Sequence, residues 1–242
     1  MGMFFQNLDK RDLFLVAFFS GLIFIFCSLY FLFIIPTKPI VSNHSNLNST
    51  IIALELIGNV EDYNNLLGVV DNPKYQFYSD SFIKSIDVDN FYIFIYSLYF
   101  LLLFEIGFRL NSFSRKIPFV FYTLLLFCIL FDLSENYKIS TILNAKSAEQ
   151  LTESILNLRM ISLCKWFIFF LISGFVGVLF WLSTESILLK IAGLFLFTAF
   201  VTSLPGLFRF SLIEIATYIL SLGLLLSWIY IIQKNYHFLF LK

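Results

Sequence analysis

The chain has 242 residues, of which 59% are hydrophobic and only 13% are charged. Soluble domains carry about 25% charged residues, so this composition excludes a soluble protein and indicates an integral membrane protein. The 16 Lys and Arg residues balance the 16 Asp and Glu residues. A nucleic-acid partner is therefore excluded, because no basic excess remains to bind phosphates.

Six apolar segments are long enough, or nearly so, to cross a bilayer core, which needs about 20 helical residues. The sequence therefore predicts an all-α, polytopic helical membrane protein that forms a single membrane domain over residues 1–242. The predicted spans cover residues 13–35, 91–108, 117–133, 165–182, 187–204 and 208–232. Lys190 lies near the start of the fifth segment, and a charged residue is costly within a span. The alternative is therefore a protein with five spans, in which the fifth segment does not cross the membrane.

The orientation follows from Lys and Arg residues in short segments beside the spans. Lys10 and Arg11 precede the first span, three basic residues lie between residues 109 and 116, and Lys234 follows the last span. An even number of spans puts these segments on one side, so we expect both termini in the cytoplasm. The Phe-, Ile-, Asn- and Lys-rich composition is typical of an AT-rich bacterial genome, which predicts a bacterial inner membrane protein.

Two regions outside the spans are also expected to be helical. Residues 37–88 are too long for a simple connection, and their apolar spacing predicts a helical extracytoplasmic loop that lies against the membrane face. Residues 141–162 carry Leu151, Ile155 and Leu158 on one stripe. We expect an amphipathic helix in the membrane interface, leading into the fourth span.

Polar residues at membrane depth are costly, so a functional site is best sought among them. Asp132, Glu135 and Asn136 end the third span and share one helix face, because they are spaced i, i+3 and i+4. Asp89 lies at the outer end of the second span, and Tyr96 continues its face. The second span enters from the outer side and the third returns to it, so these residues should lie at a similar depth.

Further polar groups reach the same level in this topology. Lys165 starts the fourth span, Glu214 lies early in the sixth, and Glu55 lies in the loop above. We expect an outer-leaflet pocket formed by Glu55, Asp89, Tyr96, Asp132, Glu135, Asn136, Lys165 and Glu214.

Simpler interpretations stay open for these residues. Asp89 and Glu135 fit solvated span ends, and Asp132 and Glu214 fit buried pairs with a purely structural role. Glu105 and Arg109, at i and i+4, are best explained as a helix ion pair.

No catalytic residue, metal site or cofactor is predicted. The chain lacks the nucleophile-elbow, zinc-protease and phosphate-loop motifs. His44 and His237 lie in peripheral segments, and the cysteines lie singly on separate spans. Whether the protein is an enzyme stays open, with a non-enzymatic role favoured.

The order of these residues resembles a pattern in uncharacterised bacterial multi-pass membrane proteins. The pattern consists of Glu55 in a short loop helix, Asp89 with Tyr96 seven residues later, and the sequence Asp132-Leu-Ser-Glu135-Asn136. It covers about residues 50–165, names no family and implies no known activity. It supports treating these residues as one set.

Three functions fit the sequence. The first is a carrier or binding protein whose pocket takes an ion, a small polar ligand or a lipid headgroup, with membrane lipid as a partner. The second is a structural or assembly subunit that contacts other membrane subunits or further copies of itself. The third is an intramembrane lipid-modifying enzyme, with Asp132 or Glu214 as the general base.

Overall fold

The computed structural model describes residues 9–36, 47–68, 72–111, 116–145 and 148–240. It is all-helical over these ranges, with 88% helix. The helices are α1 (Lys10–Ile34), α2 (Thr50–Glu55), α3 (Val60–Leu67), α4 (Pro73–Arg109), α5 (Ile117–Leu143), α6 (Ala148–Leu182), α7 (Ile187–Gly206) and α8 (Ser211–Phe240). Six of them, all but α2 and α3, are long and apolar enough to cross a membrane. The predicted all-α fold with six such helices is therefore confirmed, including the segment that carries Lys190.

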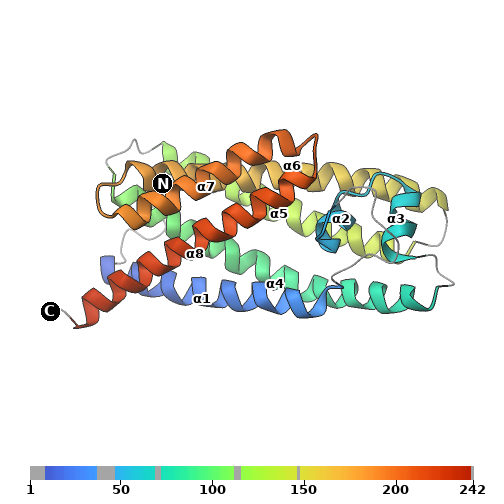
Figure 1. Ribbon diagram of the computed structural model, residues 1–242, viewed down its shortest axis with the longest axis horizontal. Coiled ribbons are helices and arrows are strands. Elements are labelled where there is room, and N and C mark those ends of the chain that lie inside the picture. Colours follow the sequence, from blue (N-terminus) through green and yellow to red (C-terminus); the bar gives the residue numbers. More distant parts are fainter. Residues whose placement is uncertain (1–8, 37–46, 69–71, 112–115, 146–147, 241–242) are drawn as a thin grey trace.

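The six long helices form an elongated bundle, and α2 and α3 lie together at one end of it (Figure 1). The beginning of α1 and the end of α8 lie at the opposite end (Figure 1). At 37 residues, α4 is about 55 Å long, which exceeds a bilayer core of about 30 Å. The ends of α4, α5 and α6 extend past α1 and α8 and lie beside α2 and α3.

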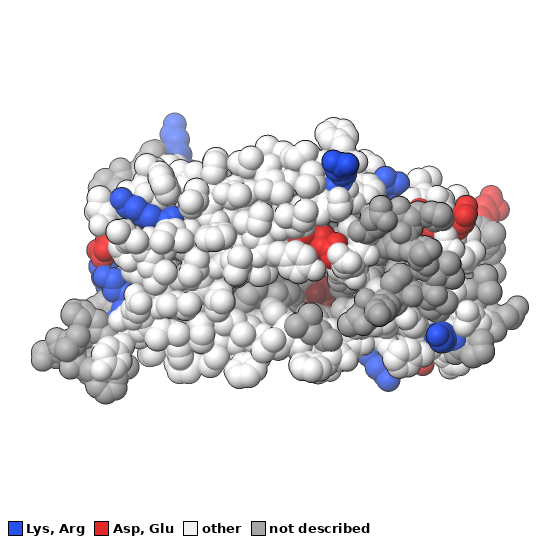
Figure 2. All heavy atoms as spheres, in the orientation of Figure 1, with Lys and Arg blue, Asp and Glu red and all other residues white. Residues whose placement is uncertain are grey.

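The charge distribution fits a bundle that crosses a membrane. Figure 2 shows Lys, Arg, Asp and Glu near the two ends of the visible face and a broad uncharged stretch between them. A small, partly recessed acidic patch lies where this stretch meets the α2 end. Exposed apolar side chains such as Phe33, Phe127 and Leu222 are then in contact with lipid, which removes the cost of their exposure.

The end of the predicted long loop belongs to α4, the second long helix. Residues 73–88 are the first turns of α4, because Asn72 accepts a hydrogen bond from the amide of Lys74 at 2.9 Å and Pro73 follows at the first helical position. The remaining loop holds α2 and α3, so the predicted helical content is confirmed there. Residues 37–46 and 69–71 of the predicted loop lie outside the described residues.

The amphipathic helix predicted at residues 141–162 is present from residue 148 and leads directly into the fourth span, while its predicted location in the membrane interface stays a prediction. Residues 141–143 end α5, and residues 148–162 belong to α6, which runs without a break to Leu182. The apolar stripe of this segment includes Ile155 and Leu158, both with 0% exposure. The stripe therefore packs into the protein rather than onto lipid. Sequence periodicity reports an apolar face but does not identify what covers it.

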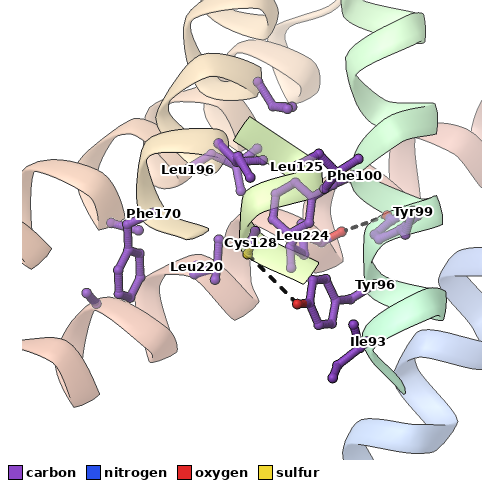
Figure 3. Packing of buried hydrophobic residues seen from close by; sticks show 14 of the residues in the cluster. Ile93, Tyr96, Tyr99, Phe100, Leu125, Cys128, Phe170, Leu196, Leu220 and Leu224 are labelled. Atoms are coloured by element: carbon purple, nitrogen blue, oxygen red, sulfur yellow. Dashed lines mark hydrogen bonds between the residues drawn. The ribbon is translucent and has the colours of Figure 1, made fainter. Parts of the chain in front are cut away.

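Close helix packing holds the second half of the bundle together. A Cβ atom on Gly177 of α6 would lie 2.7 Å from the carbonyl oxygen of Gly193 of α7, and one on Gly193 would lie 2.6 Å from that of Gly177. The two backbones are therefore in direct contact, as small residues permit in membrane helices. Figure 3 shows the neighbouring core, to which α4, α5, α6, α7 and α8 contribute Ile93, Tyr96, Tyr99, Phe100, Leu125, Cys128, Phe170, Leu196, Leu220 and Leu224.

Candidate functional site

A buried ammonium group joins three carboxylates near the α2 end of the bundle. Lys165 of α6 is 7% exposed. Its Nζ atom lies 3.1 Å from Oε1 of Glu55 and 3.5 Å from Oδ1 of Asp132, and it donates a hydrogen bond to Oε1 of Glu135. The ammonium group of α6 thus forms ion pairs with one acidic residue of α2 and two of α5. The i and i+3 spacing predicted for Asp132 and Glu135 places both toward α6.

The second oxygens of these carboxylates differ in their partners. The indole N–H of Trp166 donates to Oε2 of Glu55 at 2.8 Å, and the hydroxyl of Tyr96 donates to Oδ2 of Asp132 at 2.6 Å. Oε2 of Glu135 is buried and has no hydrogen-bond partner among the described residues. The cluster therefore retains an unused acceptor deep in the protein, which is costly in a low-dielectric interior.

Asp89 of α4 is held by a neutral partner. The side-chain amide of Asn136 donates to Oδ2 of Asp89 at 2.7 Å and to Oδ1 of Asn90 at 3.0 Å. Asn136 follows Glu135 on α5, so α5 contacts both Lys165 and Asp89 with residues of one turn. The predicted proximity of the polar ends of the second and third spans is confirmed.

A cavity of about 300 Å³ opens beside this cluster. Its polar wall is formed by Glu55, Asp89, Asp132 and Lys165, which are three acidic side chains and one basic side chain. Aromatic rings from α1, α4 and α6 form much of the remaining lining, namely Phe24, Phe31, Tyr92, Tyr96, Trp166 and Phe169. The cavity therefore has an acidic wall, with aromatic side chains beside aliphatic and hydroxyl side chains in the rest of its lining.

Glu214 does not join the cluster. Its two carboxylate oxygens accept hydrogen bonds from the backbone amides of Asn48 and Ser49, each at 3.0 Å. These amides precede α2, where helix N–H groups lack intrahelical partners and favour a negative charge. Glu214 lines an adjoining cavity of about 270 Å³, which shares Phe31, Ile35, Ile51, Ile52 and Thr217 with the first but does not include the carboxylates of the cluster. The predicted set of eight residues thus divides into seven that lie together and one that anchors α2.

Two acidic side chains consequently hold α2 at its two ends. Glu214 of α8 binds the amides at its beginning, and Glu55, its last residue, binds Lys165. The helix itself is short but buried, with Ile52 and Leu54 at 5% and 0% exposure. Ser49 caps it by accepting from the amide of Ile52.

Sequence reasoning missed several residues of the site. Trp166 follows Lys165 directly, and a buried indole N–H in an apolar span requires an acceptor, which could have indicated its bond to Glu55. Asn90 follows Asp89 in the same way. Leu220 of α8 lines the cavity without a sequence signal. The predicted Glu105–Arg109 ion pair is present, with Nε of Arg109 3.8 Å from Oε2 of Glu105.

The described residues contain no group of three or more His, Cys, Asp and Glu side chains arranged to hold a metal ion. Comparison with protein-family models, with curated proteins and with solved structures finds no match to this chain. The functional argument therefore rests on the geometry of the cavity.

Proposed function

We propose that the chain is a membrane protein that binds a small organic cation, carrying an ammonium group, in the cavity beside Lys165. The observation that supports this most is the charge imbalance of the polar wall, where Glu55, Asp89 and Asp132 face one ammonium group. A bound cation would offset this excess negative charge. An anion would meet the same three carboxylates in a site of low dielectric, where repulsion is strong.

The aromatic lining favours an organic cation over a metal ion. Ammonium groups are attracted to the faces of aromatic rings, and this attraction increases when both are removed from water. Tyr92, Tyr96 and Trp166 supply such rings next to the carboxylates. The cavity volume of about 300 Å³ is at the lower end of the range for small-molecule sites, about 300–1,000 Å³.

Asp89 is the carboxylate best placed to serve the ligand. Glu55, Asp132 and Glu135 already contact Lys165. Asp89 is held by the neutral amide of Asn136, so its charge is the least compensated in the wall. The roles as an assembly subunit and as an enzyme stay predictions, as do the bacterial inner membrane and the cytoplasmic location of the termini.

Thermal unfolding in a non-ionic detergent, with increasing tetramethylammonium chloride, tests the proposal. Sodium chloride at the same concentration controls for ionic strength. Binding to the folded state alone raises stability by about 2.7 kcal/mol when the cation is at 100 times its Kd. We expect a shift in Tm for the unmodified chain and for Asp87→Asn, whose side chain is exposed on the same helix. We expect a much smaller shift for Asp89→Asn.

Equal responses to tetramethylammonium and sodium would contradict a cation site. A normal tetramethylammonium response in Asp89→Asn would instead show that the cation binds elsewhere. The Asn side chain can keep the hydrogen bond from Asn136, so this variant removes the charge with little loss of structure.

A further inference from the structure

A second cavity continues from the first along α1 and α8. Its volume is about 220 Å³, and five of its lining residues also line the first cavity, namely Phe24, Ser28, Tyr92, Ser221 and Leu224. We call this second cavity the α1–α8 groove. It continues to Gly21 of α1 and Trp228 of α8. Gly21 precedes Ser28 by seven residues, which is about 10 Å along the helix away from the α2 end.

The surface of the groove is apolar, although it includes several polar residues. Each polar group is already hydrogen-bonded within the protein: Ser28 to the carbonyl of Phe24 and to the hydroxyl of Tyr92, Ser221 to the carbonyl of Thr217, Tyr99 to the carbonyl of Leu224, and Trp228 to the carbonyl of Phe18. The side chains found only in the groove include Ile25, Leu29 and Leu225. Such a lining suits a hydrocarbon chain better than water or a polar ligand.

Trp228 lines the groove beside Gly21 of α1. A Cβ atom on Gly21 would lie 2.5 Å from Cδ1 of Trp228, so the absence of a side chain at Gly21 lets the indole lie against α1. The indole also stacks on Phe18, with ring centroids 5.8 Å apart and planes inclined by 10°. A chain that enters from the acidic cavity would therefore reach the indole of Trp228.

We propose that the ligand is an amphiphile, in which an ammonium head occupies the acidic cavity and one hydrocarbon chain lies in the α1–α8 groove. This inference rests on the proposed function, because the acidic cavity must first bind the head. The two cavities meet at the ring of Tyr92, which lines both of them. Asp89 lies one turn earlier on the same helix, α4. Head and chain are thereby separated along one continuous site, and the class of ligand is a membrane-soluble amine.

Fluorescence quenching by a brominated chain tests the position of the hydrocarbon. Trp181→Phe removes an exposed indole and leaves Trp166 and Trp228. The difference between this protein and its Trp228→Phe derivative gives the signal of Trp228. In bilayer nanodiscs we expect an alkyl trimethylammonium with a brominated chain to quench Trp228, and excess tetramethylammonium to restore the signal by displacing the head.

A sulfate amphiphile with the same brominated chain controls for partition into the bilayer. Equal quenching of Trp228 by the cationic and anionic amphiphiles would overturn the inference, because chain entry would not depend on the head. Tetramethylammonium stabilisation without quenching of Trp228 would also overturn it, and would leave the proposed function intact. Failure of tetramethylammonium itself to stabilise the protein would overturn the proposed function.

A pair of variants on α8 separates occupation of the groove from general damage. Leu225 lines the groove, and Leu225→Phe is expected to fill it and raise the concentration of cationic amphiphile needed to quench Trp228 by about tenfold. Leu222→Phe enlarges an exposed side chain outside the groove and should leave that concentration unchanged. If both variants needed the same concentration of cationic amphiphile to quench Trp228, the placement of the hydrocarbon chain in the groove would be overturned.

Discussion

Lys165 and Glu55 are 110 positions apart in the chain, and their side chains form an ion pair with 3.1 Å between Nζ and Oε1. This contact fastens the short helix α2 to the long helix α6. The same ammonium group also meets Asp132 and Glu135 of α5. The positive charge of Lys165 therefore both holds α2 against α6 and offsets part of the negative charge of the cavity.

Lys165→Met is expected to destabilise the protein strongly. Removing one partner of a buried ion pair costs about 3–5 kcal/mol, because the remaining charges are left uncompensated. Chemical unfolding in mixed micelles measures the difference. Lys84→Met, at an exposed position of α4, is the control and should change stability by about 0.5 kcal/mol or less.

The double variant Lys165→Met/Glu135→Gln checks that this loss arises from charge. Neutralising Glu135 removes one of the stranded carboxylates, so the double variant should be more stable than Lys165→Met alone. A double-mutant cycle gives the interaction energy of the pair, typically about 0.5–3 kcal/mol for residues in contact. Additive effects of the two substitutions would contradict the ion pair.

Glu214→Leu should release the beginning of α2 and leave the rest of the bundle intact. The substitution removes the acceptor for the amides of Asn48 and Ser49, and the loss of a hydrogen bond to a charged group costs about 1.5–3 kcal/mol. Hydrogen exchange of the amides in residues 48–55 should accelerate. Glu153→Leu, at an exposed position of α6, is the control, and equal exchange in both variants would argue against an anchoring role.

Gly193→Ala should disrupt the contact between α6 and α7. The added methyl group would lie 2.6 Å from the carbonyl oxygen of Gly177, which is backbone and cannot move aside as a side chain does. We expect a loss of about 1–3 kcal/mol, as in other overpacked interiors. Thr198→Ala, at an exposed position of α7, provides the comparison. An unchanged free energy of unfolding for Gly193→Ala would contradict the backbone contact.

The end of the bundle away from α2 has its own pH dependence. The hydrogen bond from Lys234 to Glu185, 2.8 Å long, lowers the pKa of Glu185 below its ordinary value. A lowered pKa contributes stability that is present above the unfolded-state pKa and is lost as the pH falls through the folded-state pKa. The contribution is below about 1 kcal/mol because the pair is partly exposed. The stability difference between the unmodified chain and Glu185→Gln should therefore vanish in acid and persist at neutral pH.

The fold was largely predictable because membrane spans leave a strong signal. A helix that must satisfy its own backbone in lipid needs a long apolar segment, and all six such segments became long helices. Hydropathy alone did not give the lengths of these helices. The start of α6 was indicated by the apolar stripe of residues 151–158, whereas α4 begins at Pro73, well before the predicted second span.

The site was predictable as far as topology and helix spacing determine it. Asp132, Glu135 and Asn136 share one face of α5, and alternating helix directions bring Asp89 and Lys165 to the same end. Glu214 satisfied the same reasoning and still lies elsewhere, because its partners are backbone amides before α2. The α1–α8 groove escaped prediction because it arises from the packing of two helices that are distant in sequence.

Equilibrium binding of radiolabelled tetramethylammonium to the purified protein in nanodiscs tests the central claim most directly. The account predicts saturable binding of one cation per chain, weakened at least about tenfold in Asp89→Asn and unchanged in Asp87→Asn. Binding that does not saturate, or that has the same affinity in Asp89→Asn as in the unmodified chain, would contradict it.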